Sequence, residues 1–137
     1  MAFHISIGKI GELIAEKYLR SLGCRIIEKN FLRKWGEIDL IVKLPDSTLV
    51  FVEVKTMREN KFLVPEDNIT NSKLKKIRRT AMLYAGERHD LVNDKKGWRI
   101  DVISITLPYA LQLGERETLT EFVKHFSDYK INHFENV

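Results

Sequence analysis

The stretch "GEIDLIVKLPDSTLVFVEVK", from Gly36 to Lys55, decides the fold. Two apolar segments flank "PDS", whose residues are typical of a turn. The pattern predicts a strand over 37–44, a second strand over 48–55 and an antiparallel hairpin between them. Acidic residues stand in the middle of both strands, at Asp39 and Glu53, where buried strands normally carry apolar side chains.

The length of the turn determines which residues of the hairpin face each other. A three-residue loop, Pro45–Ser47, pairs Leu44 with Thr48 and therefore Asp39 with Glu53. A two-residue loop would place the two carboxylates on opposite faces of the sheet, because side chains alternate along a strand. The other face of both strands is apolar and is expected to point at the core: Ile38, Leu40, Val42, Val50, Val52 and Val54.

The paired acids indicate a metal site. Neighbouring carboxylates repel each other, and partial burial strengthens the repulsion. A divalent cation relieves it, and Mg²⁺ typically takes one or two carboxylates while it keeps several waters. We therefore expect Mg²⁺ or Mn²⁺ at Asp39 and Glu53. Lys55, on the same face as Glu53, could hold the attacking water or stabilise charge on a phosphate, and Glu12 could add a ligand from the first helix.

The remaining pattern predicts one α/β domain. Beside the hairpin, it predicts a helix over 8–22 after Ser6, a strand over 24–31, a helix over 71–87 and a strand over 98–107, with loops over 61–68 and 88–96. The first helix has an apolar arc of Gly11, Ile14, Ala15, Tyr18, Leu19 and Leu22, with Glu12 at its edge. Gly8 and Gly11 are poor helix formers and suggest close approach to a sheet or a ligand.

The domain is expected to span 1–137, with a core over about 8–107 and a C-terminal extension over about 108–137. In this extension, Leu111, Leu113 and Leu119 could belong to a short strand or helix, and "LTEFVKHFSDY" could form a helical turn or two.

The second helix is strongly basic. Its stretch "NSKLKKIRRT" carries five Lys and Arg residues and no acid, in a chain of formal net charge +4, which permits a polyanionic partner. We expect Lys73, Lys76 and Arg79 to contact phosphates, although a solvated helix face would have the same composition. Met82 and Leu83, off the apolar face, could belong to a homodimer or another protein interface.

The motifs resemble those of the YraN-like proteins, a bacterial family placed in the PD-(D/E)XK nuclease superfamily. The resemblance rests on "GKIGELIAEKYL", "GCRIIEKN", "GEIDLI", "FVEVK", the helix that begins "ITNSK", and "RIDVI". Two positions differ from the family pattern: Leu74 stands after Lys73 where Gln is usual, and Met57 stands where Arg is frequent.

The resemblance implies a restriction-endonuclease-like core, in which a central mixed sheet is flanked by helices in the order α-β-β-β-α-β. It implies functional roles for Asp39, Glu53, Lys55 and Glu12. The function expected is metal-dependent endonuclease cleavage of DNA, including branched or otherwise structured DNA. The alternative is a protein with this fold that binds nucleic acid without cutting it.

Other sequence features favour a cytoplasmic protein without membrane association. A single Cys24 excludes an intrachain disulfide. The longest uncharged stretch, 102–114, is too short to span a bilayer, and the first residues do not form a signal-peptide pattern.

Simpler interpretations stand beside these predictions. Asp39 and Glu53 could be ion-paired with Lys55, Lys43 or Arg33, and Glu37 has the strand parity to replace Asp39 as a ligand. Trp35 could stack on a base or belong to the core or its rim. The four histidines show no ligand spacing and are expected at the surface: His4, His89, His125 and His133.

Overall fold

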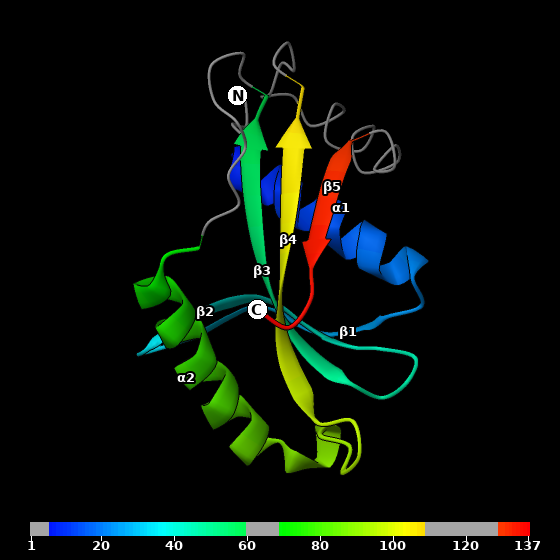
Figure 1. Ribbon diagram of the computed structural model, residues 1–137, viewed down its shortest axis with the longest axis vertical. Helices are drawn as coiled ribbons and strands as arrows, with labels where there is room; N and C mark the ends of the chain where they lie inside the picture. The colour runs from blue at the N-terminus through cyan, green and yellow to red at the C-terminus, as the bar shows by residue number, and fades with distance from the viewer. Residues whose placement is uncertain (1–5, 60–68, 109–128) are drawn as a thin grey trace, which may run out of the picture.

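One mixed β-sheet carries a helix on each face in the computed structural model, which describes residues 6–59, 69–108 and 129–137 (Figure 1). The elements are α1 (Ile7–Ser21), β1 (Arg25–Arg33), β2 (Gly36–Lys43), β3 (Leu49–Arg58), α2 (Asn71–Glu87), the 3₁₀ turn η1 (His89–Leu91), β4 (Trp98–Leu107) and β5 (Lys130–Phe134). The strand order is β1-β2-β3-β4-β5, parallel between β3 and β4 and antiparallel elsewhere. The predicted fold class is therefore confirmed.

Each helix packs on its own apolar cluster. The α1 side of the sheet is filled by Ile10, Ile14, Leu19, Leu40, Val42, Val50, Val52, Ile103 and Ile105, with smaller residues between them. The α2 side is filled by Phe31, Ile38, Ile41, Phe51, Ile77, Ala81, Tyr84 and Ile100. Both faces of the hairpin are thus buried. This explains why its strands carry more apolar residues than strands with one face exposed to solvent.

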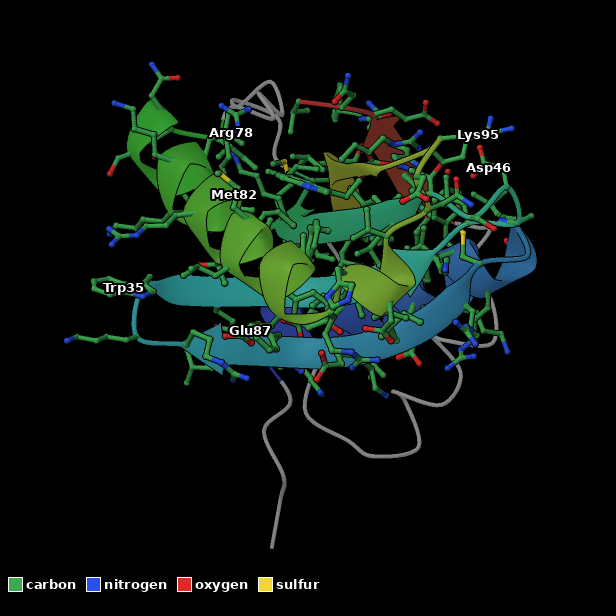
Figure 2. All side chains as sticks on the ribbon, turned by 90° about the horizontal axis from the view of Figure 1, so that it is seen from below. Trp35, Asp46, Arg78, Met82, Glu87 and Lys95 are labelled. Atoms are coloured by element: carbon green, nitrogen blue, oxygen red, sulfur yellow. The ribbon has the colours of Figure 1, made fainter. Side chains whose placement is uncertain are left out.

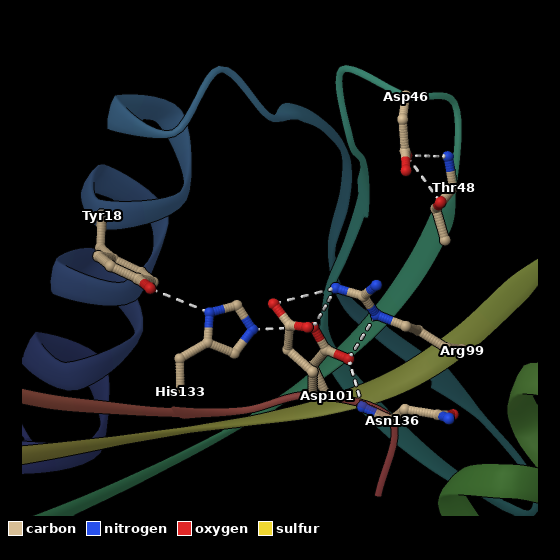
Figure 3. Close-up of polar contacts among 8 residues, drawn as sticks. Tyr18, Asp46, Thr48, Arg99, Asp101, His133 and Asn136 are labelled. Carbon is tan, nitrogen blue, oxygen red and sulfur yellow. Dashed lines mark hydrogen bonds and ion pairs between the residues drawn. The ribbon is translucent and has the colours of Figure 1, made fainter. Parts of the chain in front are cut away.

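The hairpin has the predicted register. The Leu44 amide donates to the Thr48 carbonyl at 2.9 Å across the three-residue turn. Ser47 adopts a left-handed φ of 77°, and Asp46 accepts hydrogen bonds from the Thr48 amide at 2.9 Å and hydroxyl at 2.7 Å, as Figure 3 shows. Leu40 consequently pairs with Val52, so that Asp39 and Glu53 come next along the two strands.

Ile38 does not follow the predicted alternation. It packs on the α2 side with Phe31 and Phe51, whereas Leu40, two residues later, packs on the α1 side. Asn30 on the neighbouring strand has a φ of 51°, and it lies between the residues that pair with Ile38 and Leu40. The change of side between Leu40 and Ile38 thus coincides with a left-handed residue on the paired strand.

The first helix begins and ends one residue earlier than the predicted range of 8–22. The Ser6 hydroxyl accepts a hydrogen bond from the Lys9 amide at 3.2 Å and caps the helix. Leu22 is 50% exposed although it was expected in the apolar arc, because it is the C-cap and lies outside the last turn. Ile10, which was not included in the predicted arc, is buried instead.

Gly11 allows α1 to lie directly on β3. A Cβ at this position would overlap the side chain of Thr56, whereas a Cβ at Gly8 would meet no atom within 4 Å. The expected close approach is confirmed at Gly11, and Gly8 has no such neighbour.

We expect Gly11→Ala to lower the free energy of unfolding by about 1–3 kcal/mol, because overpacking forces the helix away from the sheet. Gly8→Ala is the matched control and should be neutral or stabilising by up to about 1 kcal/mol, since alanine is the better helix former. Urea unfolding of both variants measures the difference. Equal stability of the two variants would contradict the close contact.

The fifth strand was not predicted. It adds to the free edge of β4, with Ile105 opposite Ile131 and Ile103 opposite His133. The extension beyond 108 thus includes a strand of the sheet, and the predicted features at Leu111, Leu113 and Leu119 lie outside the described residues. The loop predicted over 61–68 also lies outside them. No helix in the described ranges is both long enough and apolar enough to cross a membrane.

Candidate active site

A cavity of about 420 Å³ opens where β2 and β3 separate beneath the first turns of α2. It is lined by Gly36, Glu37, Asp39, Glu53, Thr70, Ser72, Lys73, Lys76 and Ile77. The ladder between the two strands ends at the pair Leu40 and Val52. Beyond this pair, the Val54 amide donates to Asp39 Oδ2 at 2.8 Å. The Asp39 carboxylate therefore takes the place of a backbone acceptor and is held at the point where the strands diverge.

Asp39 and Glu53 lie together, as the register predicts. The two carboxyl groups are neighbours, and a proton on Asp39 would be shared with Glu53. Burial, followed by the negative charge of Glu53, raises the pKa of Asp39 to about 7, although the bond from Val54 opposes the shift. Glu53 is only 5% exposed. One buried acid and one half-buried acid are thus held side by side at the cavity wall.

Glu12 approaches the same pair from α1. Its carboxyl group is hydrogen-bonded to Asp39, and burial, reinforced by the charge of Asp39, raises the pKa of Glu12 while Lys9 opposes the rise. A small cavity of about 20 Å³ is lined by both acids. Asp39 accordingly lies between Glu12 and Glu53, and the three acids predicted as ligands come from three different elements.

Lys73 is the ion-pair partner of Glu53. Its ammonium lies 2.6 Å from Glu53 Oε1, and the hydrogen bond to Glu53 raises the pKa of Lys73. The Lys73 amide also donates to Thr70 Oγ1 at 3.2 Å, in the N-cap of α2. The sequence suggested Lys55, Lys43 or Arg33 as ion-pair partners of these acids and predicted that Lys73 contacts a phosphate. The structure instead brings this lysine into the acidic site, although its side chain remains 59% exposed.

The other predicted site residues fall into two groups. Lys76 lines the cavity, whereas Arg79 lies on a neighbouring part of the surface with Lys34, Trp35 and Lys75. Lys55 is half-buried on β3, and strand alternation places it on the Glu53 side, outside the set of residues that line the cavity. Glu37, the second candidate ligand, is exposed and lines the cavity beside Asp39.

The donor set suits a hard divalent cation. Carboxylate oxygens are what Mg²⁺ and Mn²⁺ prefer, and a cation would replace the proton that Asp39 and Glu53 share. Within the three described ranges, no three acidic, histidine or cysteine side chains already surround one point as metal ligands. Asp39 and Glu53 would therefore be the two protein ligands of the ion, and water would complete its coordination. Glu12 would act indirectly, through its contact with Asp39 or through a coordinated water.

The shared proton predicts how stability depends on pH in the presence of EDTA. Because folding raises the pKa of Asp39, the native state binds this proton more tightly than the unfolded chain does. The contribution is complete below the unfolded pKa, near pH 4, and is lost as the pH rises towards 7. Wild type should lose about 2–3 kcal/mol across this range relative to Asp39→Asn, as measured by urea unfolding at each pH. Parallel pH profiles of the two proteins would contradict the shared proton.

Sequence reasoning also missed a second buried polar cluster, on the α1 face of the sheet (Figure 3). Asp101 on β4 is 1% exposed. Its carboxylate accepts two hydrogen bonds from the Arg99 guanidinium, from Nε at 2.9 Å and from Nη2 at 3.2 Å, and a third from the Asn136 amide at 3.0 Å. His133 Nε2 lies 2.8 Å from Asp101, and its Nδ1 lies 3.0 Å from the Tyr18 hydroxyl. His133 was expected at the surface, whereas it joins α1, β4 and β5. His89 is exposed as expected; His4 and His125 lie outside the described residues.

The mixed sheet between two helices, with acids at the separation of β2 and β3, is consistent with a restriction-endonuclease-like core. The chain belongs to the family described as "Uncharacterised protein family UPF0102", whose model matches residues 11–105. This finding confirms the YraN-like resemblance of the motifs.

Relatives named "UPF0102 protein" are similar over most of the chain. The protein from Alkaliphilus oremlandii is 38% identical over 95% of this chain and 95% of its own length. The protein from Clostridium botulinum strain Kyoto is 42% identical over 74% of this chain and 80% of its own. The protein from Vibrio parahaemolyticus is 37% identical over 72% of this chain and 79% of its own.

Proposed function

We propose that this protein is a metal-dependent endonuclease of the PD-(D/E)XK superfamily that hydrolyses phosphodiester bonds in DNA, with branched or otherwise structured DNA as its substrate. The observation that carries the proposal is the position of Asp39 and Glu53 side by side in a cavity that Lys73 and Lys76 also line. Acids that hold a cation and lysines that hold phosphate are the two requirements for phosphodiester hydrolysis by this class of site.

Each residue has a defined task in this proposal. A bound Mg²⁺ or Mn²⁺ would polarise the phosphate and lower the pKa of a coordinated water. Asp39 and Glu53 hold the ion, and the Val54 amide keeps Asp39 oriented. Glu12 supports Asp39 from α1. Lys55 orients the attacking water or stabilises the charge that develops on the phosphate.

The basic side of the cavity would receive the DNA backbone. Lys76 lies at the cavity wall, and Arg79 extends the positive surface along α2. Lys73 pairs with Oε1 of Glu53, and an incoming phosphate would offer its ammonium a new partner, which would leave the full charge of the carboxylate to the cation. The exchange would couple DNA binding to completion of the metal site.

The alternative is a nucleic-acid-binding protein without turnover, and the 2.6 Å pair of Lys73 and Glu53 favours it. A lysine that permanently neutralises Glu53 would leave no charge for a cation. The fold and the basic surface would then serve binding alone.

A cleavage assay decides between the two functions. Junction, flap, single-stranded and blunt linear DNA should be incubated with the protein in Mg²⁺, in Mn²⁺ and in EDTA. The endonuclease proposal expects products in the metals and none in EDTA. Binding to the same DNA without products in either metal would support the alternative.

The proposal includes two broader expectations. A DNA substrate suits the cytoplasmic location inferred from the sequence. Met82 and Leu83 on α2 are 59% and 46% exposed, as a homodimer or another protein interface at this helix would require. Light scattering on wild type and on Met82→Lys tests the second expectation.

A further inference from the structure

A second hollow, of about 390 Å³, lies beside the acidic cavity and has a different composition. Its lining residues are one aromatic and four cations: Lys34, Trp35, Lys75, Lys76 and Arg79. Lys76 lines both spaces, so the basic hollow and the acidic cavity are neighbours. The site therefore has an extension that carries positive charge and an aromatic ring.

Trp35 is presented by the turn between β1 and β2. It lies at the outer end of this hairpin, next to α2 (Figure 2), and is 42% exposed. The Arg79 guanidinium lies 4.0 Å from the centroid of the Trp35 ring, and the Lys34 ammonium lies 5.2 Å from it. The indole is thus held in place by cations at the edge of the hollow.

Gly36, the next residue after Trp35, already lines the acidic cavity. Asp39 follows Trp35 by four residues along the strand, about 13 Å in extended conformation. If a nucleic-acid strand places one phosphate at Asp39 and Glu53, a base a few nucleotides away on the same strand would accordingly lie near Trp35.

We propose that Trp35 and Arg79 form a stacking platform for an unpaired base of the nucleic acid, with Lys75 and Lys76 holding its flanking phosphates. An indole and a guanidinium plane are the groups on which unpaired bases stack in single-strand binding sites. Bases within a duplex are already stacked on each other and present no free face, so the platform selects single-stranded or branched substrates over blunt duplex. The inference deepens the proposed function and rests on its nucleic-acid part, not on cleavage.

The test uses the full chain in EDTA, so that cleavage plays no part. Affinity is measured by fluorescence anisotropy of a dye-labelled dT12 strand and of a labelled blunt 12-base-pair duplex. Trp35→Ala should weaken binding of the single strand about 10-fold, within the range for loss of one stacked base, and change duplex binding much less. Trp35→Phe should recover most of the affinity.

Two further measurements locate the contact. In a Trp98→Phe background, Trp35 is the remaining tryptophan, and dT12 should quench its fluorescence while the duplex leaves it nearly unchanged. Arg79→Ala should weaken dT12 binding by loss of the stacking plane, whereas Lys75→Ala should flatten the salt dependence of dT12 binding by about 0.7 units of slope, the value for one phosphate contact on a single strand. Arg78→Ala is the matched control, because the Arg78 side chain bonds the Val137 carbonyl at 3.2 Å, and it should have little effect.

The outcomes separate this inference from the proposed function. If Trp35→Ala binds dT12 as wild type does, the stacking platform is wrong. If wild type also binds duplex in that case, the nucleic-acid function survives without it. If neither DNA binds to wild type in EDTA, the stacking platform is wrong, and the cleavage assay in Mg²⁺ and Mn²⁺ alone decides the proposed function. Quenching by dT12 together with a negative cleavage assay would support the platform and reject the endonuclease.

Discussion

Asp39→Asn should reduce the rate of DNA cleavage in Mn²⁺ about 100-fold or more, because removal of one of two anionic ligands costs several kcal/mol of transition-state stabilisation. Asparagine has the same shape as aspartate, and its side-chain oxygen can still accept the bond from the Val54 amide, which is 2.8 Å long in the structure. The substitution therefore removes the charge and leaves the local backbone geometry in place. Initial rates on the best substrate of the panel measure the loss.

Glu37→Gln provides the necessary comparison. Glu37 lines the same cavity, but it lies nearer the start of β2 and is exposed. A larger loss of activity in Glu37→Gln than in Asp39→Asn would show that the ligands have been assigned to the wrong acids.

Metal binding gives a readout that does not depend on activity. An ion that binds only the folded chain raises the melting temperature, and between Asp39 and Glu53 it would also relieve like-charge repulsion. Mn²⁺ should consequently raise the melting temperature of wild type and not that of Asp39→Asn. Equal shifts in the two proteins would show that the ion binds elsewhere.

The sequence predicted the acidic pair because the information needed for it is local. The three residues of the turn fix the parity of the hairpin, and parity alone brings Asp39 and Glu53 together. The bounds of α2 and β4 could also be predicted, since the apolar residues of α2 follow a helical period and those of β4 form a nearly continuous run bounded by Gly97 and Pro108. The side of the sheet on which Ile38 packs could not be predicted, because the change of side coincides with the left-handed Asn30 on the neighbouring strand.

Contacts between distant segments account for what was missed in the site. Whether the Lys73 side chain points at solvent, at phosphate or at Glu53 depends on the angle at which α2 crosses the sheet. A local sequence pattern does not predict that angle. The stacking of Arg79 on Trp35 likewise joins a helix to a turn about forty positions earlier. The short strand β5 has too few residues for a clear period, and its place in the sheet follows from pairing with β4.

Asp101→Ala should lower the free energy of unfolding by about 3–5 kcal/mol, a loss typical of breaking a buried ion pair by removing one partner. The substitution removes the acceptor of the Asn136 amide and the buried partner of the Arg99 guanidinium, which keeps only Glu135, at 3.6 Å, among the described residues. His133 loses the partner at 2.8 Å that connects β5 to β4. Urea unfolding measures the loss, and the melting temperature should fall by roughly 10 °C.

The chain contains a matched control for this effect. Arg88 and Asp90 have the same spacing and the same two hydrogen bonds as Arg99 and Asp101. The Asp90 side chain is 62% exposed, whereas that of Asp101 is 1% exposed. Asp90→Ala should leave stability almost unchanged, because exposed pairs contribute little. Burial, rather than the pairing as such, is thus the source of the difference.

Hydrogen exchange shows whether the loss is local. Asp101 binds groups on β5 and on the segment that follows it, so the amides of Lys130–Phe134 should lose protection first in Asp101→Ala. Asp101→Asn should fall between alanine and wild type, since it keeps an acceptor for the Asn136 amide but loses the charge that faces Arg99. If alanine at this position costs no more stability than Asp90→Ala, or if β5 keeps its protection, Asp101 does not fasten the last strand to the sheet, and the pairing of β5 with β4 must hold it alone.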